Sequence, residues 1–132
     1  MSDTCSLLLV EDDHDLREIL CRALERSGCR VTCVGTPEGA REAVRTTNFH
    51  VAVIDRGLSG EDGLMLIEAL RKHNNDLKTI VLCGWCDGES AAAAVARGAF
   101  ECLSKLCRLA HLRGVVEQAY RASVARDVST CF

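Results

Sequence analysis

The sequence contains no long apolar run. Leu7 to Val10 gives four apolar residues before Glu11 interrupts them, whereas a membrane-spanning helix needs about 20. The same run is too short, and its flank too acidic, for a secretory signal peptide. We therefore expect a cytoplasmic protein that does not associate with a membrane.

The chain also lacks a large excess of one charge. Its formal net charge is −3 and its pI is near 5.8, so the composition gives no reason to expect nucleic-acid binding. No internal repeat and no linker interrupts the 132 residues, a length that suits one domain with its own hydrophobic core. We expect a single domain over residues 1–132, with its core between about residues 6 and 125 and a short C-terminal tail that frays.

Signs of a disulfide framework are missing, although cysteine is abundant. The nine cysteines are Cys5, Cys21, Cys29, Cys33, Cys83, Cys86, Cys102, Cys107 and Cys131. Their number is odd and the chain shows no secretion signal, which argues against paired disulfides. We expect mostly reduced thiols that pack as small hydrophobic side chains.

The sequence does contain a regular alternation of predicted strands and helices. Short apolar or alternating runs predict strands over residues 5–10, 30–34, 51–55, 79–83 and 101–104. Apolar residues at helical spacing predict helices from Leu16 to before Gly28, from Pro37 to about Thr47, from about Asp62 to about Lys72, between Asp87 and Gly98, and from Leu109 to about Ala125. Alternating β and α units build a parallel sheet, and five units are too few for a closed β/α barrel. The predicted fold class is α/β: a flavodoxin-like, doubly wound five-stranded parallel sheet in the order 2-1-3-4-5, with helices on both faces.

Carboxylates follow the first and third predicted strands, where a dinucleotide-binding protein would have glycines after the first. Glu11, Asp12 and Asp13 follow the first strand, and Asp55 ends the third. The ends of these two strands flank the ligand crevice of this fold, so Glu11, Asp12 and Asp55 are expected to form an oxygen-ligand site for Mg²⁺. A simpler interpretation stays open, in which the acidic residues only begin a helix and Asp55 only opens a turn.

A positive charge is predicted at the same edge of the sheet. Lys105 follows the fifth predicted strand, and a parallel sheet directs the ends of all its strands toward one edge. A lysine after a strand is usually only a solvated residue. Three carboxylates and one lysine at the ends of three strands nevertheless indicate, taken together, a charged site.

Three stretches of the sequence resemble the receiver domain of two-component response regulators, the CheY-like family. They are Leu8–Asp13 with Arg17 and Glu18, then Asp55 with Leu58, Gly60, Asp62 and Gly63, and then Gly98–Glu101 with Leu103–Lys105. The intervals from Asp12 to Asp55 and from Asp55 to Lys105 also match the family. The resemblance covers about residues 6 to 120, essentially the whole chain.

The resemblance implies a role for each charged residue of the predicted site. Asp55 would accept a phosphoryl group, and Lys105 would pair with that group after transfer. Asp12 and Glu11 would hold Mg²⁺ directly or through water, together with Asp55 and the backbone carbonyl of Gly57. Any chemistry of the chain's own would be limited to taking up the phosphoryl group and to its later hydrolysis.

The resemblance also implies the kinds of partner. The phosphoryl group would come from a sensor histidine kinase or a phosphotransfer protein. A downstream protein partner would bind the surface formed by the fourth helix, the fifth strand and the fifth helix. No DNA-binding or catalytic output domain is expected in these residues, so the chain would be a stand-alone regulator or the amino-terminal part of a longer one.

Four positions depart from the family pattern, of which Ser59, in place of a common loop proline, matters least. Cys83 stands where the family has a threonine or serine whose hydroxyl switches on phosphorylation, and Cys102 replaces the aromatic residue coupled to it. A thiol is a weak hydrogen-bond donor. Leu106 replaces a proline that usually follows a cis peptide bond. Because a cis bond before a non-proline residue costs about 2.5–4 kcal/mol, we predict that the Lys105–Leu106 bond is trans.

The cysteines near Cys83 allow more than one interpretation. Cys83 and Cys86 form a C-x-x-C motif, and Cys102 and Cys107 could complete four zinc ligands. Receiver geometry would make Cys83 and Cys102 near neighbours, so they could also oxidise, or all could be structural thiols. An alternative function is therefore a receiver-like interaction module that signals by binding or by cysteine redox state rather than by phosphorylation.

Overall fold

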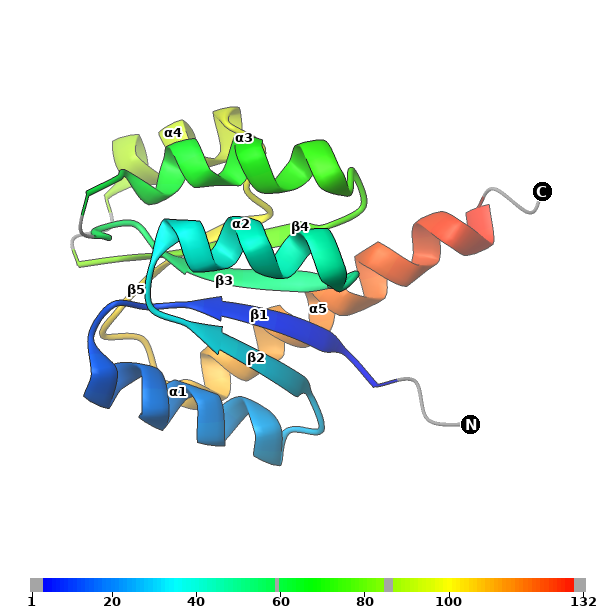
Figure 1. Cartoon of the computed structure of the whole chain (residues 1–132), viewed down its shortest axis with the longest axis horizontal. Coiled ribbons are helices and arrows are strands. Elements are labelled where there is room, and N and C mark those ends of the chain that lie inside the picture. The colour runs from blue at the N-terminus through cyan, green and yellow to red at the C-terminus, as the bar shows by residue number, and fades with distance from the viewer. Residues whose placement is uncertain (1–3, 59, 85–86, 130–132) are drawn as a thin grey trace.

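Strands and helices alternate along the chain, in a computed structural model that describes residues 4–58, 60–84 and 87–129 (Figure 1). The strands are β1 (Ser6–Val10), β2 (Arg30–Val34), β3 (Val51–Asp55), β4 (Lys78–Cys83) and β5 (Glu101–Ser104). The helices are α1 (His14–Arg26), α2 (Pro37–Thr46), α3 (Gly63–His73), α4 (Gly88–Ala96) and α5 (Leu109–Ser129). The described residues thus contain the five predicted βα units.

The five strands run parallel in the order β2-β1-β3-β4-β5. The central strand is β3, in which Val53 pairs with Leu9 of β1 on one side and with Ile80 of β4 on the other. The chain goes from β1 outward to β2 and then returns past β1 to β3, so the strand order reverses between β1 and β3. The predicted flavodoxin-like sheet is therefore confirmed, and its ligand crevice lies at the carboxyl ends of β1 and β3.

Helices cover both faces of the sheet. Helices α1 and α5 pack on one face, and α2, α3 and α4 pack on the other (Figure 1). Successive side chains of β3 point to opposite faces: Ala52 and Ile54 join the core under α2, α3 and α4, whereas Val51 and Val53 join the core under α1 and α5. Every residue of β3 is buried, so the strand that ends in Asp55 is covered on both sides.

Four helices begin at a side chain that accepts a backbone hydrogen bond from the first helical turn. These N-cap residues are Asp13 for α1, Thr36 for α2, Asp62 for α3 and Asp87 for α4. The first amides of a helix have no carbonyl partner within the helix, and a capping oxygen satisfies one of them. All four caps lie in loops that leave the carboxyl edge of the sheet, so they fix the chain around the crevice.

The largest difference from the predicted boundaries is at the C-terminus. Helix α5 extends to Ser129, whereas the helix was predicted to end near Ala125 and to be followed by a frayed tail. Residues 126–129 are helical because each added residue gains a backbone hydrogen bond once a helix exists, whether or not the apolar periodicity continues. Smaller differences place the start of β1 at Ser6 and that of β4 at Lys78.

Two further expectations concern the backbone and the membrane. The described residues contain no cis peptide bond, so the prediction of a trans bond between Lys105 and Leu106 is confirmed. Within the same residues, no helix combines the length and the apolar character that crossing a membrane requires.

Candidate functional site

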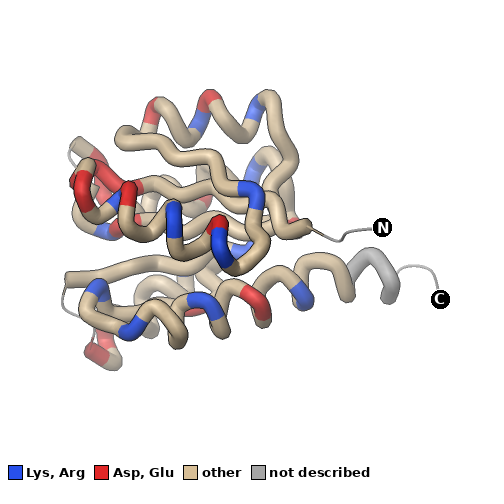
Figure 2. Tube along the Cα trace, turned by 90° about the horizontal axis from the view of Figure 1, so that it is seen from below, with Lys and Arg blue, Asp and Glu red and all other residues tan. Residues whose placement is uncertain are grey.

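The carboxylates of Glu11, Asp12 and Asp55 lie together at the carboxyl edge of the sheet. One carboxylate oxygen from each residue lies within 4.8 Å of those from the other two. Glu11 and Asp12 come from the loop between β1 and α1, and Asp55 is the last residue of β3. Acidic residues gather at this end of the molecule in Figure 2. The structure therefore brings together the carboxylates that the sequence predicted to converge.

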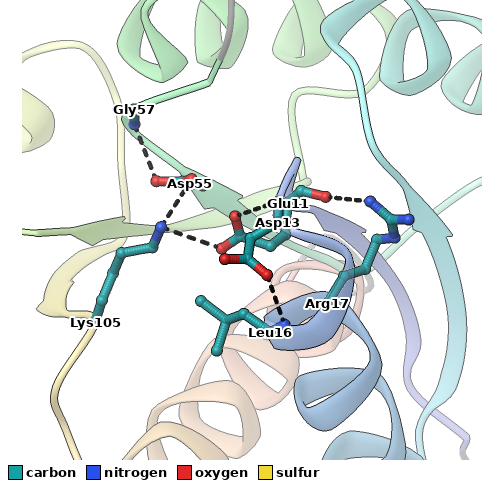
Figure 3. A network of polar contacts seen from close by, with 7 residues as sticks. All are labelled: Glu11, Asp13, Leu16, Arg17, Asp55, Gly57 and Lys105. Atoms are coloured by element: carbon teal, nitrogen blue, oxygen red, sulfur yellow. Dashed lines mark hydrogen bonds and ion pairs between the residues drawn. The ribbon is translucent and has the colours of Figure 1, made fainter.

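Lys105, just after β5, supplies the opposite charge. Its Nζ lies 2.9 Å from Oδ2 of Asp55 and 3.4 Å from Oε1 of Glu11 (Figure 3). Partial burial acts to lower the pKa of this ammonium group, but the contacts with Asp55 and Glu11 outweigh it and raise the pKa of Lys105 overall. Lys105 is therefore protonated at neutral pH and partly balances the two carboxylates.

Glu11 is fully buried, with 0% of its surface exposed. Its Oε2 accepts a hydrogen bond of 3.2 Å from the amide of Asp13, whereas its buried Oε1 receives no hydrogen bond from the protein. Burial and, second to it, the neighbouring carboxyl of Asp55 together raise the pKa of Glu11 to about 7. An isolated negative charge in this place is costly, so the site favours a proton or an added cation near Glu11.

The loop after β3 fixes the orientation of Asp55. The amide of Gly57 donates a 2.9 Å hydrogen bond to Oδ1, while Oδ2 faces Lys105. Gly63 lies close to the same backbone, because a Cβ atom there would be 2.6 Å from the carbonyl oxygen of Asp55. Only glycine permits this approach. Both carboxylate oxygens of Asp55 are thus engaged, and only 3% of the residue is exposed.

Two neighbouring residues support the loop between β1 and α1. Asp13 is the N-cap of α1 and accepts from the amide of Leu16 at 3.0 Å. Arg17 donates from Nη1 to the carbonyl oxygen of Glu11 at 2.8 Å (Figure 3). Asp13 therefore does begin a helix, which is the simpler interpretation of the acidic residues after β1, but this interpretation does not describe buried Glu11. No role was predicted for Arg17, although its position one helical turn beyond the N-cap, on the same helix face, is a signal for such a contact.

The ligand set suits a hard divalent cation. Three carboxylates offer oxygen ligands, and the buried Oε1 of Glu11 has no hydrogen bond that binding of an ion would break. Oxygen-only sites of this kind suit Mg²⁺, which keeps several water ligands. Among the described residues, no three cysteines or histidines form a comparable group. The described residues therefore give no support to a zinc site made of cysteines. Cys86, which that site requires, lies outside the described residues. So does Trp85, the sole tryptophan of the chain.

Cys83 and Cys102 are in contact, as receiver geometry predicted. Their Sγ atoms are 3.0 Å apart, and both side chains belong to the core under α2, α3 and α4. Phe100 packs against the core on the other face of the sheet, so it does not take the place of the aromatic residue that Cys102 replaces. The carbonyl oxygen of Cys83 accepts a 2.8 Å hydrogen bond from the amide of Lys105. The cysteine pair is therefore joined through the backbone to the charged site.

Comparison with known proteins gives consistent matches along the chain. A family model described as "Response regulator receiver domain" matches residues 7–117. The photosynthetic apparatus regulatory protein RegA of Rhodobacter capsulatus is 37% identical over 100 residues, and the acid tolerance regulatory protein ActR of Rhizobium meliloti is 40% identical over 101 residues. Each alignment covers 76% of this chain but only 54% and 52% of the relatives. The chain thus spans about half the length of these relatives.

Solved structures show the same fold. A response regulator protein from Burkholderia pseudomallei with a phosphorylated aspartic acid, a calcium ion and citrate is 25% identical, with a TM-score of 0.80 over 95% of this chain and 72% of that one. The receiver domain of the Francisella response regulator 1452 is 24% identical, with a TM-score of 0.83 over 89% of this chain and 98% of that one. The second likeness supports the fold alone.

Proposed function

Because the chain belongs to the response regulator receiver domain family, we propose that Asp55 accepts a phosphoryl group from the phosphohistidine of a sensor histidine kinase or a phosphotransfer protein. The observation that carries the proposal is the ion pair between buried Asp55 and Lys105, beside Glu11 and Asp12. A carboxylate with this neighbourhood has both the nucleophilic oxygen and the charge balance that phosphoryl transfer requires.

In the proposed reaction, a carboxylate oxygen of Asp55 attacks the phosphorus atom. The bond between phosphorus and the donor histidine nitrogen breaks, and its electron pair leaves with the imidazole. Negative charge spreads over the phosphoryl oxygens, and the ammonium group of Lys105 is placed to pair with them because it already contacts Asp55. The amide of Gly57, bonded to Oδ1, keeps the carboxylate oriented during the attack.

We propose that Mg²⁺ is the metal of this site, held by Glu11, Asp12 and Asp55, directly or through water, and by the backbone carbonyl of Gly57. A bound divalent ion would neutralise charge on the transferring group and on the crowded carboxylates. The buried Oε1 of Glu11 supports this proposal, because the oxygen has no hydrogen bond within the protein and its neighbours include a second carboxylate.

Signalling to a downstream protein would use α4, β5 and α5. This surface exposes large apolar side chains: Val95 is 56% exposed, Leu106 is 89% exposed and Leu109 is 40% exposed. The phosphoryl group adds a charge of about −1.5 to −2, enough to bias a nearby loop. Since Cys83 offers a thiol rather than a hydroxyl, we expect this bias to be weaker than in relatives with threonine or serine at this position.

The proposal is tested with a small phosphoryl donor such as acetyl phosphate and with Mg²⁺. The wild-type chain should gain the mass of one phosphoryl group, and Asp55→Asn should gain none. Asp15→Asn is the matched control, because Asp15 has an almost fully exposed side chain on α1 and its loss should leave the incorporation unchanged. Incorporation that survives in Asp55→Asn would refute the assignment of Asp55 as the acceptor. A wild-type chain that takes up no phosphate would refute phosphorylation altogether and favour a module that signals by binding or by cysteine redox state.

A further inference from the structure

We propose that Cys83 and Cys102 form a thiol–disulfide redox site next to the phosphoryl-acceptor site. The two residues lie on neighbouring strands, where Val81 pairs with Cys102 and Cys83 pairs with Ser104. Their Sγ atoms are 3.0 Å apart. The proposal concerns a covalent bond that phosphorylation neither needs nor supplies, so it goes beyond the proposed function.

The geometry brings the two sulfur atoms close to bonding distance. A disulfide bond is about 2.05 Å long, so the two sulfur atoms need to approach each other by about 1 Å for the bond to form. Both thiols point into the same core, and Cys83 is 2% and Cys102 is 9% exposed. The pair is therefore preformed by the fold rather than assembled from mobile surface residues.

Cys83 borders open space at the carboxyl edge of the sheet. It lines a pocket of about 760 Å³, together with residues of the loop after β3 and Ser90 of α4. Cys102 lies on the neighbouring strand β5 and does not line this pocket. In the proposal, Cys83 therefore reacts first with the oxidant, and Cys102 resolves the product.

A hydroperoxide is the class of oxidant that the proposal requires. The thiolate of Cys83 attacks the terminal peroxide oxygen, the O–O bond breaks, and Cys83 becomes a sulfenic acid while an alcohol, or water from hydrogen peroxide, leaves. The thiol of Cys102 then attacks the sulfenic sulfur, the S–O bond breaks, and water leaves as the disulfide forms. Overall the two cysteines lose two hydrogen atoms and the peroxide is reduced by two electrons.

The bond would close the chain segment between Cys83 and Cys102. This segment contains all of α4, so oxidation would fasten both of its ends. The amide of Lys105 donates to the carbonyl oxygen of Cys83, which places the bond one hydrogen bond away from the residue that pairs with Asp55. The redox state would therefore act on the same loops that phosphorylation is proposed to bias.

Peptide mapping of the oxidised full chain tests the proposal. The protein is treated with hydrogen peroxide, free thiols are blocked with N-ethylmaleimide, and trypsin is added without reductant. Cleavage after Lys78, Arg97 and Lys105 separates residues 79–97, which contain Cys83, from residues 98–105, which contain Cys102. We expect these two peptides to be joined, with a mass equal to their sum minus two hydrogen atoms plus one N-ethylmaleimide group on Cys86, and to separate after treatment with dithiothreitol.

Two variants identify the bond. Residues 79–97 also contain Cys86, so the joined peptides should persist in Cys86→Ser and disappear in Cys83→Ser. Should Cys83→Ser fail to fold, the map of Cys86→Ser still decides. A bond confined to residues 79–97, a joined product lost in Cys86→Ser, or no joined product in the wild type would overturn the proposal. The joined peptides should also form in Asp55→Asn, which separates this outcome from that of the phosphorylation assay.

Discussion

The carboxyl group of Glu11 lies inside the protein beside that of Asp55, and its Oε1 receives no hydrogen bond from the protein. Its only charged neighbour of opposite sign that the structure places within 4 Å is Lys105, which it shares with Asp55. The ammonium group of Lys105 can balance only one of the two carboxylates when both are ionised. A second positive charge near Glu11 and Asp55 is therefore favourable. A proton on Glu11, or the divalent ion proposed for this site, would supply that charge.

The metal-free protein should lose stability as the pH rises because of Glu11. Its pKa is raised from 4.5 to about 7 in the folded state, so the folded state keeps a proton that the unfolded state releases. The favourable contribution is complete below pH 4.5 and is lost as the pH passes 7. With EDTA present, Glu11→Gln should therefore gain free energy of unfolding relative to wild type between these pH values, on the order of 3 kcal/mol at most.

Urea unfolding at a series of pH values checks this expectation. The difference between Glu11→Gln and wild type, rather than either curve alone, isolates the one carboxyl from the other titrating groups. A difference in free energy of unfolding that stays constant from pH 4.5 to 7.5 would contradict the raised pKa of Glu11.

Replacement of Lys105 by alanine should slow phosphorylation. The ammonium group contacts Asp55 at 2.9 Å, and removal of one preorganised group that stabilises transition-state charge lowers the rate by roughly 100- to 1,000-fold. The rate of phosphoryl incorporation from acetyl phosphate measures the effect. Lys72→Ala, which removes an exposed lysine from α3, should leave the rate unchanged, and equal rates in the two variants would contradict the role of Lys105.

At the scale of elements, the junction of β3 and α3 tolerates no side chain at Gly63. A Cβ atom there would lie 2.6 Å from the carbonyl oxygen of Asp55 and 2.8 Å from Cα of Arg56, and both are backbone atoms that cannot rotate away. We expect Gly63→Ala to lower the free energy of unfolding by about 1–3 kcal/mol. Gly114→Ala is the control, since a Cβ atom in α5 meets nothing within 4 Å and alanine should stabilise the helix by about 0.5–1 kcal/mol.

Both variants are compared with wild type by urea unfolding, and the phosphorylation rate is measured alongside. Gly63→Ala should also slow phosphorylation, because the clash falls on the backbone of Asp55. Equal stability of Gly63→Ala and wild type would show that the junction can relax.

The elements themselves could be predicted because their signals are local. The bounds of β3 and β5 followed from short apolar runs, and α2 begins at Pro37 as predicted. The sheet order followed from alternation and from the small number of βα units. The C-terminal extension of α5 could not be predicted, because helix propagation depends on backbone hydrogen bonds that leave no apolar pattern.

The candidate site was predictable in position but not in detail. Glu11, Asp55 and Lys105 each stand at the end of a predicted strand, and this is enough to place all three at the carboxyl edge of a parallel sheet. Which carboxylate is buried and which caps a helix depends on side-chain packing across the sheet, so the separate roles of Glu11 and Asp13 emerge only from the structure. The same holds for the contact of Arg17 with the backbone of Glu11.

At the scale of the whole molecule, one hydrophobic core lies on each face of the sheet. The charged site lies at the carboxyl edge of that sheet, next to both cores. A ligand that binds only the folded state stabilises all of it. We expect Mg²⁺ at about 100 times its dissociation constant to raise the free energy of unfolding by about 2.7 kcal/mol. Asp12→Asn should reduce this gain, because it removes one of the three clustered carboxylates.

Thermal unfolding with and without MgCl₂ measures the gain. Sodium chloride at the same ionic strength is the control for general screening, and it should not reproduce the stabilisation. Equal effects of the two salts on the wild-type chain would mean that the carboxylate cluster holds no specific ion.

The complete burial of β3 has a consequence for where motion can arise. Amide hydrogens of a central strand exchange with solvent only when the whole protein opens, whereas peripheral elements exchange through smaller openings. We therefore expect β3, which carries Asp55, to be among the last segments to open, whereas α4, in which only Ala94 is buried, should open at a lower free energy. A change in charge at Asp55 should then displace α4 more readily than β3.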